Sequence, residues 1–333
     1  MKLLHWTVFI DLLGYQDLNG DVQDIESAKE LIGFMNSNKQ IFEDQTKNEQ
    51  VKEMYAKSSY NLYEHYEISF AFISDSLIIS YTPNLDKDFS EEIALMHSAN
   101  SLLIILQRLR LLIYKCAHEK KIFLRGGISN DYSYIHGNFA VGKGVGSAYV
   151  AETHAKYPRV ILAEDVASNT KLMNAIDSLS MRMYNVSLIK DDGKKYLDFN
   201  CFGRITLDAK SNNEFVIKKA TSSPTNYKES ILHELGVLKG YKDAIEFQIR
   251  KALVLKGSMD PDGIKLYNSL KDKYIWLTNY HNESCISFSD LRIALPGSFI
   301  SKDLSAFQIF KDVSRIISKA KELCIDDELL KQL

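Results

Sequence analysis

The sequence predicts an α+β fold: an antiparallel sheet built on the split βαβ plan, followed by a mostly helical C-terminal region. Three observations favour this class. Short β-rich segments alternate with helical segments in the first part of the chain. After Ser222–Asn226 the composition shifts, and nearly all later segments have helical periodicity. Hydrophobic residues make up 45% of the chain and charged residues 25%, which suits a globular protein with a large core.

The N-terminal elements follow in a clear order. His5–Leu12 is a run of aromatic and β-branched residues and predicts a buried strand. Residues 24–54 have helical periodicity and predict two helices. Tyr66–Tyr81 predicts a hairpin with Asp75 at its turn. Ser90–Glu119 predicts one long helix, because acidic residues begin it and lysines follow it, as the helix dipole favours.

Later segments complete this first part of the chain. The expected elements are a strand over Ile122–Ile128, a strand over Tyr134–Val141 paired with it, a helix over Gly142–Ala155, and short strands over Arg159–Ala163 and Tyr196–Phe199. A charged turn over Lys190–Lys195 precedes the last strand. The leading order βααββαβ matches the split βαβ plan, which gives an antiparallel sheet with helices on one face.

The second part of the chain is expected to be helical. Helices are predicted over Tyr227–Gly240, Tyr241–Lys256, Asp260–Tyr280 and Asp303–Lys321. A soft boundary between Ala209 and Asn226 divides the chain into two expected domains, residues 1–209 and residues 226–333. Aromatic residues lie on one face of Lys271–Asn282, and they predict docking on the sheet or across a dimer interface.

Charge and composition exclude several classes of protein. The chain has 41 Lys and Arg and 43 Asp and Glu, so its formal charge of −2 gives no general attraction to nucleic acid or an anionic membrane. No apolar run reaches the roughly 20 residues that span a bilayer, and the N-terminus lacks the pattern of a signal peptide. The four cysteines form no CxxC pair, which argues against a zinc ribbon. We expect a cytoplasmic protein without membrane or nucleic-acid partners.

Two aspartates stand among apolar neighbours, Asp11 at the end of the first strand and Asp75 at the hairpin turn. In the split βαβ plan this strand lies beside the hairpin, so both carboxylates are expected at one end of the sheet. An unpaired buried carboxylate is costly, and two hard carboxylates suit Mg²⁺ or Mn²⁺. Alternatively, Asp11 caps a turn and Asp75 is solvated, but the apolar neighbours of the pair favour metal binding.

A glycine turn follows Asp11 directly and comprises Leu13, Gly14, Tyr15 and Gln16. A strand-to-helix turn of this kind presents backbone N–H groups that can hold phosphate oxygens. Most such turns bind nothing. Beside two carboxylates that hold metal ions, this turn predicts a site for a triphosphate.

Four segments together resemble the catalytic domain of class III nucleotidyl cyclases: FIDLLGY, the hairpin aspartate, LRGGISND and GKGVGSAYVAETHAKYPRVIL. They resemble most the pyrimidine cyclases of bacterial Pycsar antiphage defence, over about Val8–Asp198. The resemblance implies a ferredoxin-like cyclase domain with two Mn²⁺ (or Mg²⁺) ions per site. By the same resemblance, Asp11, the Leu12 carbonyl and Asp75 hold the metals, and Leu13–Gln16 hold the triphosphate.

The resemblance also implies an activity and its partners. A uridylate cyclase would convert UTP to 3′,5′-cyclic UMP and pyrophosphate, as a homodimer with active sites at the subunit interface. The product would act on a separate effector protein in antiviral defence. CTP as the substrate remains an alternative, as does an inactive nucleotide-sensing or dimerisation module of the same fold.

The sequence departs from purine cyclases at the positions that contact the base. Those enzymes have polar side chains where this chain has Ala71 and Phe139, which offer no side-chain hydrogen bond to a purine. A flat ring such as Phe139, or Phe72 beside Ala71, can pack on a smaller base. We therefore expect a pyrimidine nucleotide. The Asn and Arg that contact ribose and the transition state in adenylate cyclases correspond to Gly146 and Val150.

Another cation must replace that missing Arg if the chain is active. The available cations are Arg125, Lys143, Lys190, Lys194 and Lys195. Among them, we expect Arg125 to be catalytic, and we expect Lys194 and Lys195 near the substrate phosphates. The alternatives are an ion pair between Arg125 and a surface acid, and a solvated loop for the two lysines. Glu152 is expected to form a structural ion pair with Arg159 or Lys156.

Overall fold

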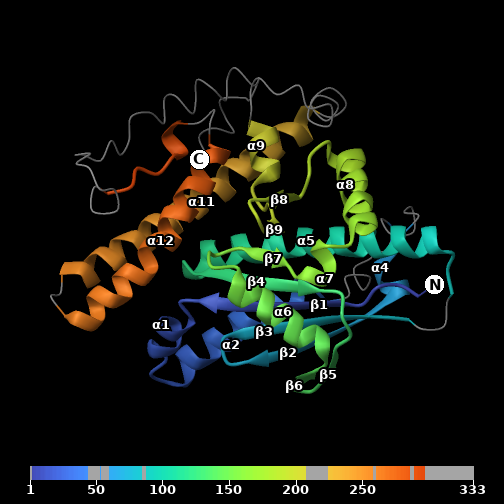
Figure 1. Cartoon of the computed structure of the whole chain (residues 1–333). Helices are drawn as coiled ribbons and strands as arrows, with labels where there is room; N and C mark the ends of the chain where they lie inside the picture. The colour runs from blue at the N-terminus through green and yellow to red at the C-terminus, as the bar shows by residue number, and fades with distance from the viewer. Residues whose placement is uncertain are drawn as a thin grey trace. The chain divides into compact units, whose positions relative to one another are not determined.

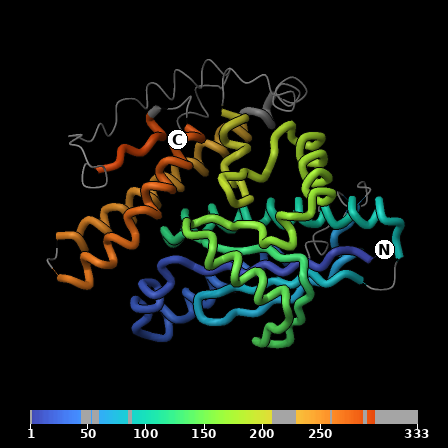
Figure 2. Tube along the Cα trace, in the orientation of Figure 1, coloured from blue at the N-terminus to red at the C-terminus, as the bar shows by residue number. Residues whose placement is uncertain are grey.

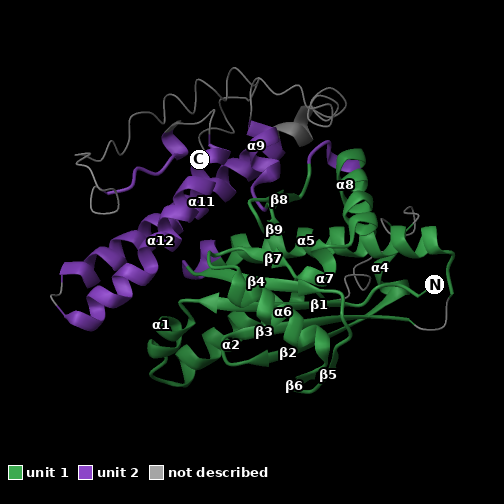
Figure 3. Ribbon diagram, viewed as in Figure 1, with its two compact units in different colours: residues 1–116, 122–182, 187–198 green, residues 117–121, 183–186, 199–333 purple. Residues whose placement is uncertain are grey.

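The computed structural model describes residues 2–43, 53, 60–84, 88–207, 224–257, 260–285 and 289–296 (Figure 1). The chain forms two compact units (Figure 3). The first unit comprises residues 1–116, 122–182 and 187–198, and the second comprises residues 117–121, 183–186 and 199–333. The fold is α+β, with a mixed sheet in the first unit and helices in the second. Most of the expected boundary between Ala209 and Asn226 lies outside the described residues.

The sheet of the first unit has seven strands in the order β2-β3-β1-β4-β7-β9-β8. The strands are β1 (Trp6–Leu13), β2 (Tyr66–Ile73), β3 (Ser76–Pro83), β4 (Phe123–Ser129), β7 (Val160–Leu162), β8 (Ile189–Asp191) and β9 (Lys195–Leu197). The central strand β1 is antiparallel to both β3 and β4. The expected antiparallel sheet is wrong at one place, because β4 and β7 pair in parallel.

Helices cover both faces of this sheet, and the expectation of one covered face is wrong. Lys39 of α2 (Ile25–Gln40) lies over the Phe70 ring of β2. Ala148 of α6 (Lys143–His154) packs with Ala71, the next residue of β2. Successive side chains of a strand point to opposite faces, so α2 and α6 lie on opposite faces. In Figure 1, α6 crosses in front of β1 and β4.

The long helix α5 (Glu91–Lys120) confirms the helix expected over Ser90–Glu119. It contacts α2, where Asn38 Nδ2 donates a hydrogen bond to Cys116 Sγ at 3.7 Å. Lys115 Nζ also donates to Ser37 Oγ at 2.6 Å. The second helix expected within residues 24–54 lies mostly outside the described residues.

The segment expected as one strand over Tyr134–Val141 is instead a separate hairpin of β5 (Tyr134–His136) and β6 (Phe139–Val141). Gly137 adopts a φ of 56° in the turn, a left-handed conformation that suits glycine. The chain therefore reverses within this segment, and β4 pairs with β1 and β7 instead. Part of the expected charged turn over Lys190–Lys195 forms β8 and the start of β9.

Four further helices are short or unexpected: α1 (Tyr15–Gly20), α4 (Leu62–His65), α7 (Glu164–Ala167) and α8 (Thr170–Tyr184), the last two residues of which belong to the second unit. No helix was expected where α8 lies. Its buried side chains nevertheless have helical spacing in the sequence: Leu172, Ala175, Ile176 and Leu179.

The second unit is helical. It contains α9 (Cys201–Leu207), α11 (Pro224–Gly257), α12 (Pro261–Ser284) and a 3₁₀ turn at Ser289–Leu291. Two helices were expected where α11 runs without a break through Gly240. Figure 2 shows α11 and α12 side by side. The helix expected over Asp303–Lys321 lies outside the described residues.

The aromatic face of Lys271–Asn282 packs inside this second unit. The Tyr280 ring lies 4.5 Å from that of Phe199, and its hydroxyl accepts the Asn200 N–H at 2.9 Å. Within the part of the chain that the structure describes, no helix has the length and apolarity to cross a membrane.

Candidate functional site

The β2–β3 hairpin brings Asp75 beside Asp11, as the sequence predicts. Ile73 pairs with Ser76, so the turn consists of Ser74 and Asp75, and Asp11 pairs with Ser76 across β1 and β3. The Leu12 N–H donates to the Asp75 carbonyl at 3.0 Å. The two aspartates therefore lie at the same end of the sheet, Asp11 on β1 and Asp75 in the turn before the adjacent strand β3.

Arg125 lies at the same end of the sheet, on β4, which pairs with the other edge of β1. Asp11 pairs with Arg125 across β1 and β4, and Arg125 Nη2 lies 3.3 Å from Asp11 Oδ2. Arg125 Nε donates to Glu152 Oε1. The Asp11 and Arg125 side chains are 18% and 23% exposed, whereas that of Glu152 is 3% exposed. Asp11 and Arg125 can therefore reach a ligand, and Glu152 is enclosed.

The partner of Glu152 differs from the expected one. Arg159 pairs with Asp192 instead, with Nη1 2.7 Å from Oδ2. Glu152 faces β4 because α6 packs directly on the strand backbone at Gly127. A Cβ on Gly127 would lie 2.2 Å from the Ala148 carbonyl oxygen, so only glycine permits this approach. The two glycines of LRGGISND indicate that a helix can approach this strand closely. They do not indicate that Glu152 is the carboxylate that lies above the strand.

The negative charges of both aspartates also act on the Glu152 carboxyl. Burial raises the pKa of the Glu152 carboxyl, and the nearby Arg125 guanidinium opposes this shift. The charges of Asp11 and Asp75 raise the same pKa further. Two carboxylates, those of Asp11 and Glu152, therefore contact one guanidinium, and the charge of Asp75 acts on the same site.

The donor chemistry of the aspartate pair suits a hard cation. Asp11 and Asp75 are both half-buried, and their carboxylate oxygens are the ligands that Mg²⁺ and Mn²⁺ prefer. Leu12, whose carbonyl was predicted to join them, is a buried residue of β1. Among the described residues, no group of three or more His, Cys, Asp or Glu side chains is arranged to hold a metal ion.

The glycine turn after β1 has the expected form. Gly14 has a φ of 100° and caps α1, and its carbonyl accepts the Asp17 N–H at 3.2 Å. Leu13 and Tyr15 are half-buried, and Gln16 is exposed. The turn thus lies directly beyond Asp11, and its role in holding phosphate stays a prediction.

The structure does not bring the three predicted base-contact residues together. Ala71 is buried in an apolar cluster with Phe9 and Ile135. Phe72 follows Ala71 in β2 and so points to the other face of the sheet. Phe139 lies on the β5–β6 hairpin and is 78% exposed.

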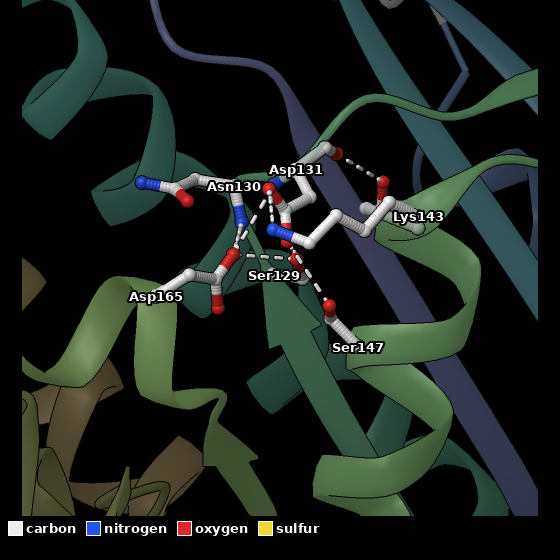
Figure 4. Close-up of polar contacts among 7 residues, drawn as sticks. Ser129, Asn130, Asp131, Lys143, Ser147 and Asp165 are labelled. Atoms are coloured by element: carbon white, nitrogen blue, oxygen red, sulfur yellow. Dashed lines mark hydrogen bonds and ion pairs between the residues drawn. The ribbon is translucent and has the colours of Figure 1, made fainter.

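A polar network fixes the beginning of α6 (Figure 4). Asp165 Oδ2 accepts the Ser129 hydroxyl at 2.6 Å and the Asn130 N–H at 2.7 Å. The Asp131 carboxylate then accepts Lys143 Nζ at 3.1 Å and Ser147 Oγ at 3.0 Å. Sequence reasoning did not assign this network, because it joins polar residues from three separate segments.

Lys194 and Lys195 line a pocket of about 870 Å³ on another side of α6. Gly146 and Val150 also line this pocket, whereas Asp11, Asp75 and Arg125 are not among its lining residues. Lys195 Nζ donates to the Ala167 carbonyl at 3.2 Å. The predicted phosphate-contacting groups are therefore divided between two places on one chain.

Apolar side chains are exposed along the β5–β6 hairpin and α6. We call them the hairpin patch: Tyr132, Tyr134, Phe139, Val141, Tyr149 and Val150, each 48–78% exposed. The elements β5 and β6 contact each other, as do β6 and α6, and exposed apolar groups on neighbouring elements can mark interaction sites.

Comparison with known proteins supplies no family for this chain. No protein-family model matches the sequence, and no curated protein matches it significantly.

Proposed function

We propose that this protein is a pyrimidine nucleotide cyclase of the class III type, which converts UTP to 3′,5′-cyclic UMP and pyrophosphate. The observation that carries the proposal is the meeting of Asp11, Asp75 and Arg125 at one end of the sheet, beside the Gly14 turn. Carboxylates suited to metal ions and a guanidinium suited to phosphate are the groups that phosphoryl-transfer chemistry needs.

The proposed reaction needs no covalent enzyme intermediate. The ribose 3′-hydroxyl gives its proton to water and its oxygen attacks the α-phosphorus in line, so that the 3′-O–P bond forms as the α–β phosphoanhydride bond breaks and pyrophosphate leaves. Divalent ions bound by Asp11, Leu12 and Asp75 would lower the pKa of the 3′-hydroxyl and neutralise phosphate charge. Arg125 donates hydrogen bonds to phosphate oxygens, and the turn at Leu13–Gln16 orients the triphosphate.

A homodimer would complete the site. Lys194 and Lys195 line a pocket that does not contain Asp11 or Asp75, so one chain presents two partial sites. In a dimer, the aspartates of one chain can meet the pocket of the other, and the hairpin patch offers an apolar surface for association. The chain resembles defence cyclases, and this resemblance implies that its product would signal to a separate effector protein.

A nucleotide-binding protein without catalysis is the second candidate. Gly146 and Val150 carry no polar side chain where adenylate cyclases have Asn and Arg, and both line the pocket. CTP in place of UTP is a further alternative within the cyclase proposal, because Ala71 and Phe139 do not distinguish the two bases.

One experiment separates these functions. The purified chain is incubated with Mn²⁺ and each of the four nucleoside triphosphates, and the products are identified by mass spectrometry. Cyclic UMP supports the uridylate cyclase, and cyclic CMP supports the alternative substrate. Nucleotide binding without any cyclic product contradicts the enzyme and favours the binding protein.

A further inference from the structure

The Arg125 guanidinium donates hydrogen bonds to two carboxylates, and each bond uses a different edge of the group. Its Nε donates to Glu152 Oε1, and its Nη2 donates to Asp11 Oδ2 at 3.3 Å. Nη1 has no hydrogen-bond acceptor among the described residues. A guanidinium has five N–H donors in a fixed plane, so the donors of Nη1 remain for a ligand. The Arg125 side chain is 23% exposed, so part of it is accessible to a ligand.

Glu152 is held rigidly behind this arginine. Its side chain is 3% exposed, and α6 carries it close to β4 because Gly127 allows contact with the helix backbone. The other end of α6 is fixed by the hydrogen bonds from Lys143 and Ser147 to Asp131 (Figure 4). A carboxylate enclosed in this way does not reach a substrate, and its contact with a ligand passes through Arg125.

We propose that Glu152 is a positioning residue, which holds the Nε edge of Arg125 so that its Nη edge faces a substrate phosphate beside Asp11 and Asp75. The inference rests on the proposed function, because it assigns the phosphate groups of a nucleoside triphosphate as the ligand of Arg125. Two neighbouring acids would otherwise draw the flexible arginine toward themselves. A fixed partner at Nε keeps one edge directed outward.

The test measures binding of inorganic triphosphate with Mg²⁺ to the full chain by calorimetry. The variants are Glu152→Gln, Arg125→Lys and the double variant, with Glu91→Gln as a control. Glu91 is exposed and pairs with Lys171, so its substitution removes one negative charge away from the site. Thermal unfolding confirms that each variant is folded.

Glu152→Gln should weaken triphosphate binding about 10- to 100-fold, the range expected for one charged hydrogen bond. Lysine has no Nε–H edge for Glu152 to hold, so the double variant should bind as weakly as Arg125→Lys alone. Glu91→Gln should bind as the wild type does. With UTP, Glu152→Gln should lower kcat/KM by a similar factor, and Glu152→Asp should restore part of it.

Unchanged binding in Glu152→Gln, or equal weakening by Glu152→Gln on the wild-type and Arg125→Lys backgrounds, overturns the inference. If Glu152→Gln does not fold, Glu152→Asp carries the same test, because it withdraws the carboxylate by one methylene and should bind with intermediate strength. Glu152→Asp binding equal to that of the wild type then counts against the inference. A wild type that binds triphosphate but cyclises no nucleotide refutes the proposed function alone, and the binding comparison still decides the role of Glu152.

Discussion

Arg125 lies between Asp11 and Glu152, with its Nη2 3.3 Å from the Asp11 carboxylate and its Nε bonded to the Glu152 carboxylate. The arginine and Asp11 face each other on neighbouring strands, whereas Glu152 comes from a helix above the sheet. One side of the guanidinium is therefore part of the protein interior, and the other adjoins the aspartate pair.

Replacing either aspartate should abolish the proposed cyclisation. Asp11→Asn and Asp75→Asn each remove one negative ligand for a divalent cation, and chemistry that depends on metal charge should lose several kcal/mol, about 100-fold or more in rate. Both residues are half-buried at the surface end of the sheet, so thermal unfolding should change little. Glu67→Gln, an exposed change on β2, is the matched control. Near wild-type turnover in both aspartate variants would exclude the metal assignment.

Gly127→Ala should destabilise the first unit strongly. The added Cβ would lie 2.2 Å from the Ala148 carbonyl oxygen and 2.7 Å from the Ala151 Cβ, so α6 must move away from β4. We expect the free energy of unfolding to fall by about 1–3 kcal/mol or more. Urea denaturation measures this difference.

Gly146→Ala is the natural control, because a Cβ there meets nothing within 4 Å. This position is inside α6, and alanine should raise the free energy of unfolding by roughly 0.5–1 kcal/mol. Equal effects of the two substitutions would show that α6 does not depend on close contact at Gly127.

The aspartate pair could be predicted from the sequence because its signals are local. The apolar strand around Asp11 and the two β-rich runs around Asp75 fix a strand and a hairpin, and the order of the elements then places them side by side. The turn after β1 needs a residue with a positive φ, 100° here, and the glycine at position 14 indicates such a turn in the sequence. These features depend on residues that are neighbours in the chain.

The partners of α6 could not be predicted in the same way. Glu152 has basic residues nearby in the sequence, and these suggested Arg159 or Lys156 as its partner, but the strand register places Arg125 beneath it. Residue type alone suggests that Phe72 can contact a base as Phe139 can, but alternation along β2 turns Phe72 to the face opposite Ala71. Such contacts depend on register and on the face of a helix, which short patterns leave open.

Acid should destabilise the fold between about pH 6.5 and 4. The Ser133 N–H donates to His5 Nε2 at 3.2 Å, so this nitrogen must be unprotonated in the folded state. Burial lowers the pKa of His5 from 6.5 to about 4, and it lowers the pKa of His281 to about 4 as well. The unfolded state therefore binds more protons in this range, and stability falls as pH falls through it.

Each histidine should contribute about 1–3 kcal/mol to this loss. Urea denaturation of the wild type and of His5→Gln at a series of pH values measures it. The His5→Gln protein should lose less stability between pH 6.5 and 4 than the wild type. Parallel curves for the two proteins would show that His5 titrates equally in the folded and unfolded states.

Activity should depend on dimerisation through the hairpin patch. Phe139→Ser removes its most exposed aromatic side chain, and it should shift the chain toward the monomer in sedimentation and lower turnover in parallel. Met181→Ser, at another apolar residue that is 43% exposed, should leave both unchanged. A Phe139→Ser protein that remains dimeric would place the interface elsewhere.

Mixing two inactive variants should restore activity if each site draws on two chains. One variant carries Asp11→Asn, and the other carries Lys194→Met with Lys195→Met, which alters only the pocket beside α6. Heterodimers then contain one site with both sets of groups intact. Turnover should recover to at most about half of the wild-type value per such dimer. Full activity of an undamaged monomer at high dilution would refute the shared site.

Base choice should favour pyrimidines over purines. Ala71 is 2% exposed within an apolar cluster, and Phe139 has only an aromatic ring to offer. No polar side chain at either position therefore pairs with the edge of a purine, and each polar atom left unpaired there costs roughly 1–3 kcal/mol. Two such losses give a preference of about 10²–10³ for UTP or CTP over ATP and GTP. Competition among equal concentrations of the four nucleotides measures this ratio, and ATP turnover equal to that of the better pyrimidine would identify a purine cyclase instead.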